Sequence, residues 1–343
     1  MSEPFTERFR CTYLLPIRRV RADDAEARRF ALYFRGLAAA GCEVVVVDGS
    51  PPEVFAGHAR HWSGLCCHVG VDPRYKYLNG KVNGVHTGVD LASCERVVLA
   101  DDDIRYTAED IGRACALLER HEMVRPQNYL APLPLWARTE SARMLINRGA
   151  LRAGDYPGTC AFRRSAFRRV GHFDGDVLFD NEEIVRHFAV SGADVLCATD
   201  FFVLKRPPTF NKWLEQRPRQ AYEDFVMRAK TLLFASLVPA AVLLWLFAGA
   251  AALAFAAAVA LASVLVALRG LLRDDAYEFF PLSTPLYAPP WVLERALSVY
   301  WAFYWRVRYG GYPFGSALLS KGTGRAWVAG GRAESRAAAG RAG

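Results

Sequence analysis

Short apolar runs punctuate the first 125 residues, and longer stretches in which apolar positions recur with helical spacing separate them. Each run is apolar on both faces and is bounded by polar or turn-forming residues, a pattern typical of strands buried inside a sheet. Strands that alternate with helices predict an α/β fold built on a doubly wound parallel sheet. The predicted strands are CTYLLPI (11–17), CEVVVVD (42–48), LCCHVG (65–70) and RVVLAD (96–101).

Helix-end signals lie between these strands. A predicted helix over 23–41 closes on a glycine, the next begins beside Pro52, and a third covers 79–92. Thr107, with Asp110 three positions later, predicts a capping box at the start of a fourth helix.

A long stretch without charge, from Thr231 to Leu268, interrupts the second half of the chain. Two spans of about 17 to 19 residues fit on either side of Gly249, enough at roughly 1.5 Å of rise per residue to cross a bilayer. We therefore predict a tight transmembrane hairpin in a multi-pass protein of the cell membrane, although Pro239 and the many alanines are also compatible with two buried core helices. Basic residues on both sides of the stretch predict that its ends, and the domain before it, are cytoplasmic. These residues are Arg217, Arg219, Arg228, Lys230, Arg269 and Arg273.

The net charge of +8 is concentrated in two regions. Residues 201–230 hold seven Lys/Arg against three acidic residues, and residues 291–343 hold eight against two. Because both regions adjoin the apolar stretch, their predicted partner is an anionic membrane surface and not nucleic acid. The aromatic segment 291–311 predicts an amphipathic helix in the membrane interface. The eight cysteines show no CxxC spacing and are predicted to be free thiols.

Three consecutive aspartates, Asp101, Asp102 and Asp103, end the fourth predicted strand, and Asp48 ends the second. Doubly wound sheets bind ligands at the carboxyl ends of their strands. Side chains alternate in direction along a strand, so Asp101 and Asp103 are predicted to converge while Asp102 points elsewhere. Two converging carboxylates suit Mg²⁺ or Mn²⁺, which offsets their repulsion. A solvated acidic turn is the alternative.

Four sequence elements together resemble the family 2 glycosyltransferases of the GT-A fold, a Rossmann-like nucleotide-diphospho-sugar transferase domain. In chain order they are VVVVDGS, NGKVNGVHTG, VVLADDDIRY and GTCAFRRSAFRRVGHFDGDVLFDNEEIVRHFAVSGADV. The likeness covers roughly residues 10–220. The apolar hairpin that follows is similar to that of ceramide-glucosyltransferase-like and other lipid-modifying members.

The resemblance implies a metal-dependent hexosyltransferase with roles for individual residues. Asp48 contacts the nucleobase of a nucleotide-sugar donor, and Lys81 lies near the donor phosphates. Asp101 and Asp103 form the DxD element that binds ribose and Mn²⁺ or Mg²⁺. Such an ion stabilises the negative charge that develops on the departing nucleoside diphosphate.

The catalytic base departs from the family pattern. Inverting members carry a Glu-Asp pair whose aspartate is the base, and in LFDNEEI that pair falls on Asp180 and Asn181. Because Asn does not accept a proton, Asp180 is the first base candidate and Glu183 the second, with Glu182 also open. A polyprenyl-phosphate acceptor is already ionised and needs no base, whereas a lipid hydroxyl gains about 10²- to 10⁴-fold from one. Both acceptors stay open, and a simple charge cluster at a helix start is the structural alternative.

A second departure concerns the QxxRW motif of the family. The sequence QRPRQAY offers Gln216 and Arg219 as substrate-binding residues but has Gln220 in place of the Trp. That Trp helps processive members to hold a polymer, so its absence favours transfer of a single sugar. A basic run beside a membrane also accounts for the arginines of this segment.

These observations predict an inverting glycosyltransferase that moves one sugar from a cytosolic nucleotide-sugar to a lipid-linked acceptor. One rival is a non-catalytic GT-A-like membrane scaffold, suggested by Asn181. Another is a haloacid-dehalogenase-type phosphohydrolase, whose usual Thr or Val is replaced here by Arg105. The predicted domains are a nucleotide-binding half (1–125) and an acceptor half (126–220) of a GT-A domain (1–220), a juxtamembrane segment with the hairpin (221–270), an interfacial region (271–328) and a disordered tail (329–343).

Overall fold

The computed structural model describes residues 10–314 and 317–324, and the chain forms two compact units. The first predicted boundary, at 125/126, coincides with a boundary between the units, but the chain afterwards returns to the first unit twice. The predicted acceptor half 126–220 is therefore shared between the units, and the predicted tail 329–343 lies outside the described residues. The first unit contains Met1–Arg125, Pro157–Asp176 and Asp180–Leu196, and the second contains Pro126–Tyr156, Val177–Phe179 and Cys197–Gly343.

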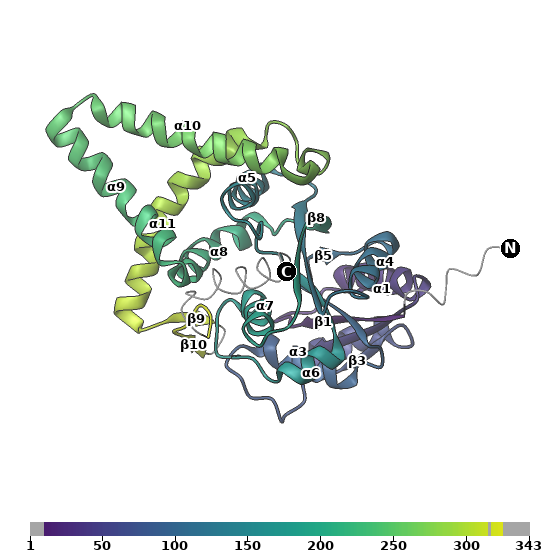
Figure 1. Cartoon of the computed structure of the whole chain (residues 1–343). Coiled ribbons are helices and arrows are strands. Elements are labelled where there is room, and N and C mark those ends of the chain that lie inside the picture. Colours follow the sequence, from purple (N-terminus) through teal and green to yellow (C-terminus); the bar gives the residue numbers. More distant parts are fainter. Residues whose placement is uncertain (1–9, 315–316, 325–343) are drawn as a thin grey trace. The chain divides into compact units, whose positions relative to one another are not determined.

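The sheet begins with the four predicted strands, which belong to the first unit and are mutually parallel (Figure 1). They are β1 (Cys11–Ile17), β2 (Cys42–Asp48), β3 (Cys67–Val69) and β4 (Arg96–Ala100). The sheet is mixed, because β7 (Thr159–Arg163) runs antiparallel to both β4 and β6 (Met123–Leu130). With β5 (Ile104–Arg105) and β8 (Val195–Lys205), the strand order is β3-β2-β1-β4-β7-β6-β8-β5.

Helices of the first unit follow the predicted end signals. The capping box is confirmed, since Thr107 accepts from the amide of Asp110 and the Asp110 carboxylate accepts from the amide of Thr107. Asn79 caps the third helix through a bond from the amide of Lys81. These helices are α1 (Asp24–Ala39), α2 (Pro52–Trp62), α3 (Gly80–Leu91), α4 (Ala108–Leu117), α6 (Arg164–Val170) and α7 (Asp180–Val190).

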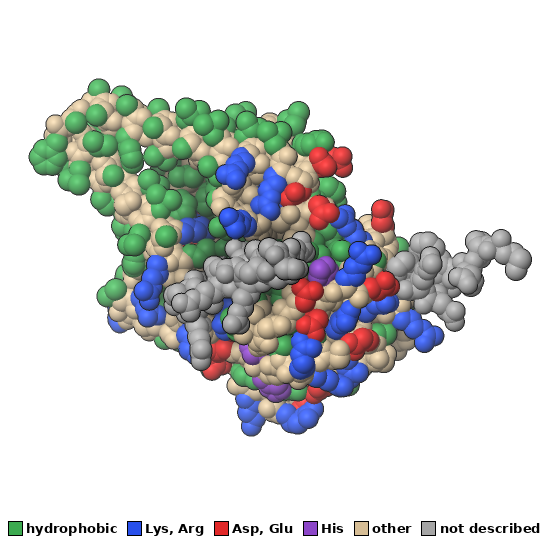
Figure 2. All heavy atoms as spheres, viewed as in Figure 1, with side chains coloured by type: hydrophobic (Ala, Val, Ile, Leu, Met, Phe, Trp, Pro, Cys, Tyr) green, Lys and Arg blue, Asp and Glu red, His purple; other side chains and the backbone are tan. Residues whose placement is uncertain are grey.

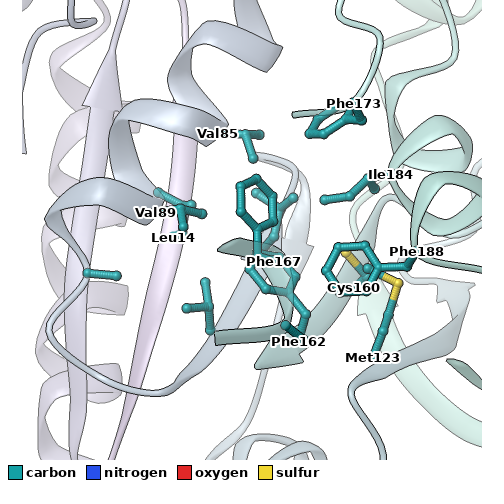
Figure 3. Close-up of a cluster of buried hydrophobic side chains, with 14 of the residues drawn as sticks. Leu14, Val85, Val89, Met123, Cys160, Phe162, Phe167, Phe173, Ile184 and Phe188 are labelled. Carbon is teal, nitrogen blue, oxygen red and sulfur yellow. The ribbon is translucent and has the colours of Figure 1, made fainter. Parts of the chain in front are cut away.

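A buried aromatic cluster fixes α6 and α7 against the sheet (Figure 3). The ring of Phe162, on β7, lies 5.2 Å from Phe167 of α6 and 5.8 Å from Phe188 of α7, between ring centroids. Full burial of such a side chain stabilises a fold by roughly 1.5–3 kcal/mol. The cluster therefore holds in place the helix whose first residues are Asp180 and Asn181.

The second unit is mainly helical and contains the predicted hairpin (Figure 1). Its long helices are α5 (Leu135–Ala150), α8 (Phe210–Glu223), α9 (Arg228–Ala248), α10 (Ala251–Leu272) and α11 (Ala288–Tyr309), and a short hairpin of β9 (Tyr312–Phe314) and β10 (Ala317–Leu319) follows. Short 3₁₀ segments connect α8 to α9, at Asp224–Val226, and α10 to α11, at Arg273–Glu278 and Thr284–Tyr287; the second of the three is kinked at Asp274 and Asp275. Gly249 turns the chain between α9 and α10 with a φ of 52°, a conformation that glycine adopts readily.

α9 and α10 are long and apolar enough to cross a membrane. Their most apolar windows have mean hydropathies of 2.2 and 2.6, and only 11% and 17% of these windows are buried. Figure 2 shows hydrophobic side chains covering this hairpin. Length and composition alone are weak support for a span, but a core helix of a soluble protein would be mostly buried.

The last part of α10 packs closely on α5 through two glycines. A methyl group added to Gly270 would lie 2.9 Å from the amide nitrogen of Gly149, and still closer to the carbonyl oxygen of Leu145. A methyl added to Gly149 would meet the backbone of α10 in the same way. The two backbones therefore approach more closely than any other residue type allows, as in the small-residue contacts of membrane helices.

Candidate functional site

Three element ends meet at one point of the first unit. Asp101 directly follows β4, Lys81 lies in the first turn of α3, and Asp180 begins α7. The Lys81 ammonium contacts the carboxylate of Asp101 and lies 2.6 Å from Oδ2 of Asp180. Burial by itself lowers the pKa of Lys81, but the two carboxylates outweigh it and hold that pKa above its ordinary value.

Asn181 completes this cluster. Its Oδ1 accepts from the Lys81 ammonium at 2.7 Å, and its Nδ2 donates to Oδ2 of Asp101 at 3.0 Å. An aspartate at this position could accept from Lys81 but could not donate to Asp101, and it would add a third negative charge. The departure from the family pattern therefore matches the local hydrogen bonding. We call Lys81, Asp101, Asp180 and Asn181 the lysine cluster.

The other acidic residues at the start of α7 have partners of their own. Glu183 is fully buried, and its carboxylate accepts two bonds from Arg186, one of them at 2.8 Å. Glu182 forms a buried ion pair with Arg125 at 3.0 Å. Of the predicted base candidates, only Asp180 belongs to the lysine cluster.

The three consecutive aspartates do not share one environment. Asp101 faces Lys81 and Asn181, while Asp102 pairs with the guanidinium of Arg19, which also binds Glu26. Asp103 is partly buried directly before β5. The three aspartates lie in the turn between β4 and β5, so their different directions come from the turn and not from alternation along a strand.

Asp48 forms a second polar cluster, at the end of β2. Its carboxylate has no exposed surface and accepts from the amide of Ser50 at 2.9 Å, from His58 at 2.7 Å and from His68 at 3.0 Å. Burial by itself raises the pKa of Asp48, but these bonds hold it well below its ordinary value. The ligand atoms lie within 4.8 Å of one another, as in some metal sites, yet the individual distances are those of hydrogen bonds. Asp48 is therefore buried together with His58 and His68 and does not lie at an open surface.

Gln216 and Arg219 lie on α8, in the second unit. Gln216 is half-buried. Arg219 donates to Glu223 at 2.9 Å and to the carbonyl of Leu178 at 3.3 Å, and its guanidinium lies 5.0 Å from the ring centre of Phe314. These contacts fix Arg219 beside Leu178 and Phe314 within the second unit.

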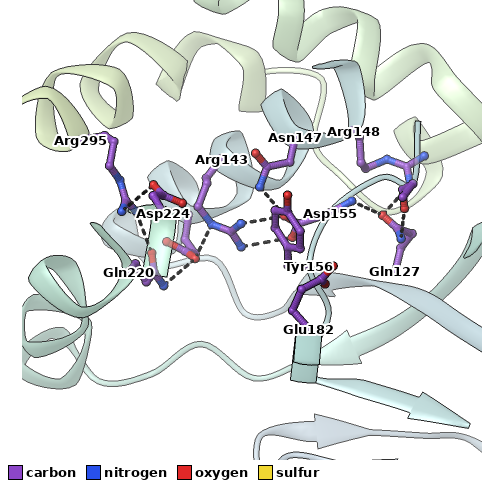
Figure 4. Close-up of polar contacts among 12 residues, drawn as sticks. Gln127, Arg143, Asn147, Arg148, Asp155, Tyr156, Glu182, Gln220, Asp224 and Arg295 are labelled. Atoms are coloured by element: carbon purple, nitrogen blue, oxygen red, sulfur yellow. Dashed lines mark hydrogen bonds and ion pairs between the residues drawn. The ribbon is translucent and has the colours of Figure 1, made fainter. Parts of the chain in front are cut away.

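Gln220, which stands where the family pattern has Trp, lies in a buried polar network of the second unit (Figure 4). Its amide nitrogen donates to Glu140 at 3.4 Å, and its amide oxygen accepts from Arg295 at 3.2 Å. Glu140 also accepts from Arg143 at 2.7 Å and from Arg217 at 3.0 Å. An indole has one donor and no acceptor, so a Trp could not make both of the bonds of Gln220.

Sequence comparison does not place the chain in a family, since no known family profile and no curated protein match it. Solved structures do match it. Mannosyltransferase PcManGT from Pyrobaculum calidifontis, in complex with GDP-Man and Mn²⁺, has a TM-score of 0.50 and 19% identity over 87% of this chain and 88% of that chain. Glucosyl-3-phosphoglycerate synthase from Mycobacterium tuberculosis, in complex with Mn²⁺, UDP and phosphoglyceric acid, has a TM-score of 0.39 and 15% identity over 60% of this chain and 73% of that chain.

The match to the mannosyltransferase shows the class of fold. The chain has an α/β, Rossmann-like sheet of the GT-A type found in nucleotide-sugar glycosyltransferases. The lysine cluster lies in this fold at the carboxyl end of β4, where sheets of this kind bind ligands.

Three participants of these clusters were not predicted. Asn79 donates to Asp180 at 3.4 Å, and His58 and His68 bind Asp48. Only Asn79 carried a usable signal, because an Asn before a helical run is a common cap and a cap lies beside the first turn. The histidines are 10 and 20 residues beyond Asp48, and no sequence spacing connects them.

Proposed function

We propose that the protein is a divalent-metal-dependent glycosyltransferase that transfers a single sugar from a nucleotide-sugar to a lipid-linked acceptor at a membrane. The observation that carries the proposal is the lysine cluster at the carboxyl end of β4 in a GT-A fold. The mannosyltransferase of this fold is in complex with GDP-Man and Mn²⁺. We therefore assign a nucleotide-sugar as the donor and Mn²⁺ or Mg²⁺ as the cofactor.

The residues at this edge of the sheet fit a divalent ion. Asp101 and Asp103 offer carboxylate oxygens, the ligands that Mn²⁺ and Mg²⁺ prefer. Asp101 already lies beside a positive charge, the Lys81 ammonium. When bound, the ion supplies positive charge for the departing diphosphate. We assign Lys81 to the donor phosphates, where its ammonium exchanges a carboxylate partner for a phosphate oxygen.

The nucleobase contact predicted for Asp48 is assigned to the pair of Asp48 and His68. The Asp48 carboxylate has no exposed surface, and its oxygen already accepts a bond from His68. In this arrangement Asp48 orients the imidazole, and the imidazole carries the recognition.

Hydrogen bonding around the base candidates favours a phosphate acceptor. The carboxylate oxygens of Asp180 accept from Lys81 and Asn79, and those of Glu183 accept from Arg186. Taking a proton would neutralise the negative charge through which Asp180 pairs with Lys81, and Glu183 with Arg186, so either residue would be a costly base. An ionised polyprenyl phosphate attacks the anomeric carbon without giving up a proton, so we favour it over a lipid hydroxyl.

The hairpin of α9 and α10 supports action at a membrane. Its side chains are exposed and apolar, with Phe247 85% and Leu246 68% exposed near the turn. On α11, Trp301 and Tyr304 are at least half exposed, as expected of a helix in the interface. We propose that the hairpin spans the bilayer with the first unit on the cytoplasmic side. Gln216 and Arg219 then stay candidates for the acceptor head group.

The test is sugar transfer by the purified full-length protein in detergent. UDP-, GDP- and dTDP-sugars are supplied with Mn²⁺ and a polyprenyl phosphate, and the lipid product is measured by mass spectrometry. Asp103→Ala should abolish product, and Asp102→Asn, a neighbouring carboxylate that faces Arg19, should keep most of the activity. No turnover of any donor by wild type, or full activity in Asp103→Ala, would contradict the proposal and favour a non-catalytic scaffold.

Asp180→Asn separates the two acceptors. With a phosphate acceptor it should lower the rate by no more than about tenfold, because no proton is removed from the nucleophile, whereas loss of a general base costs about 10²- to 10⁴-fold. A loss in the larger range would assign Asp180 as the base and a hydroxyl as the acceptor.

A further inference from the structure

The first unit contains a cavity that the proposed reaction does not use. It has a volume of about 490 Å³ and is lined by Arg74, Tyr75, Lys76, Tyr77 and His172. This volume is within the range of small-molecule sites, roughly 300–1,000 Å³. The lining comes from the loop before α3 and from the loop after α6.

The two loops are fixed to each other. The amide of Leu78 donates to the carboxylate of Asp176 at 2.8 Å, and the amide of Asn79 donates to the carbonyl of Gly175 at 3.1 Å. Any side chain on Gly175 would collide with the ring of Tyr77. The hydroxyl of Tyr77 is also 3.0 Å from Nδ1 of His172. The cavity is therefore part of the built fold and not a chance gap between separate loops.

A buried histidine lies behind the aromatic wall of the cavity. The ring of His86, on α3, lies 5.1 Å from Tyr75, 5.5 Å from Tyr77 and 4.3 Å from His172, between centroids. Its side chain is 2% exposed, and its Nε2 has no hydrogen-bond partner among the described residues. A buried polar atom without a partner costs free energy, and this cost falls when a ligand or water supplies one.

The charges around the cavity are balanced. Arg74 binds Asp72 at 2.7 Å and Asp90 at 3.2 Å, and Asp90 also accepts from the hydroxyl of Tyr75 at 2.7 Å. Lys76 is exposed and forms no ion pair or hydrogen bond within residues 10–314 and 317–324. Two cations beside two carboxylates create no strong attraction for an anion. The wall instead offers ring faces together with donors and acceptors.

We propose that this cavity binds a sugar ring, as a carbohydrate subsite separate from the lysine cluster. Sugars present an apolar C–H face that packs on aromatic rings, and their hydroxyls both donate and accept hydrogen bonds. Tyr75, Tyr77 and His172 supply the rings, Lys76 and Arg74 supply donors, and the Tyr77 hydroxyl supplies an acceptor. Only the source of the sugar, a saccharide carried by the acceptor, rests on the proposed function.

The test measures sugar binding without turnover. Methyl α-D-mannopyranoside and methyl β-D-glucopyranoside are titrated into the full-length protein without Mn²⁺ or nucleotide, and saturation-transfer NMR reports binding. A sugar-free detergent such as an amine oxide is required, because maltoside head groups would compete. Tyr75→Ala and His172→Ala should weaken binding roughly two- to tenfold, the range expected for loss of one ring contact. Tyr277→Ala, which removes an exposed tyrosine of the other unit, is the matched control and should leave binding unchanged.

Binding to wild type that His172→Ala weakens supports the subsite. Because His172 is exposed, His172→Ala should leave the fold intact. It therefore tests the proposal even if Tyr75→Ala lowers the thermal midpoint. Three results would overturn the proposal. They are no saturation transfer to either glycoside, binding to both variants as strong as binding to wild type, and displacement of the sugar by inorganic phosphate at equal concentration. Asp101→Asn separates the two hypotheses, since it should lose transfer and keep sugar binding.

Discussion

Because α5 and α10 are in close contact, we predict that one methyl group added at Gly270 destabilises the protein. In Gly270→Ala the new Cβ would lie 2.9 Å from the amide nitrogen of Gly149 and closer still to the carbonyl oxygen of Leu145. Backbone atoms cannot rotate away as a flexible side chain can. The helices must therefore separate, or α10 must shift along its axis.

The expected cost follows from this geometry. Restoring an ordinary contact requires the helices to move apart by more than about 1 Å, and a gap of about 1 Å already forfeits up to half of each dispersion contact. The affected interface includes the buried side chains of Ala142, Leu145, Ala267 and Leu271. Overpacking of this kind typically lowers the free energy of unfolding by about 1–3 kcal/mol. Because the added methyl meets backbone atoms, which cannot rotate away, we expect a loss of about 3 kcal/mol for Gly270→Ala.

The assay is the thermal midpoint of the purified full-length protein, followed by tryptophan fluorescence in detergent. At a few degrees per kcal/mol, Gly270→Ala should lower the midpoint by roughly 5–10 °C, and Gly149→Ala by a similar amount. Gly36→Ala is the matched control, because Gly36 lies in α1 with no atom within 4 Å of the added methyl. It should stabilise the protein by about 0.5–1 kcal/mol. If Gly270→Ala is as stable as wild type, the close helix contact is wrong.

Further predictions concern single side chains. Burial, and then His172, lowers the pKa of His86 to about 4, so its contribution to stability is complete above about pH 6.5 and is lost as the pH falls toward 4. In denaturant titrations, the free energy of unfolding of wild type should fall by roughly 2–3 kcal/mol between about pH 6.5 and pH 4, and that of His86→Phe should not show this fall. Lys81→Met leaves two carboxylates without their cation and should destabilise the protein by about 2 kcal/mol at pH 7, and Mn²⁺ should raise its thermal midpoint more than that of wild type. Gln220→Trp, which introduces the Trp of the QxxRW motif, should cost about 1–3 kcal/mol in the thermal assay because Glu140 and Arg295 each lose a hydrogen bond. Equal stability of Gln220→Trp and wild type would remove the account given for that departure.

Much of the first unit could be predicted because its strands are apolar on both faces. The predicted strands 11–17 and 42–48 agree with β1 and β2 residue for residue. The third strand is shorter than predicted because β3 lies at the edge of the sheet, next to β2 in the strand order. The antiparallel β7 was not predicted, since pairing direction depends on the path of the chain and not on periodicity.

Residues of the candidate site could be predicted where a polar side chain directly follows a strand or begins a helix. Asp101 after β4 and Lys81 at the start of α3 were both assigned, and they are in contact. The partners of Asp48 were not assigned, because His68 reaches it only through the pairing of β2 and β3. The use of an amide at Asn181 became understandable only when its two partners were known.

Interleaving of the two units limits how the protein can be shortened. The chain crosses between them after residues 125, 156, 176, 179 and 196. A fragment that stops at residue 220 would keep α5 but lose α10, and it would expose the glycine-lined face of α5 to water. Attempts to obtain a soluble catalytic fragment by removing the apolar hairpin should therefore give aggregating material, unless α5 is replaced or its exposed face is redesigned as a polar surface.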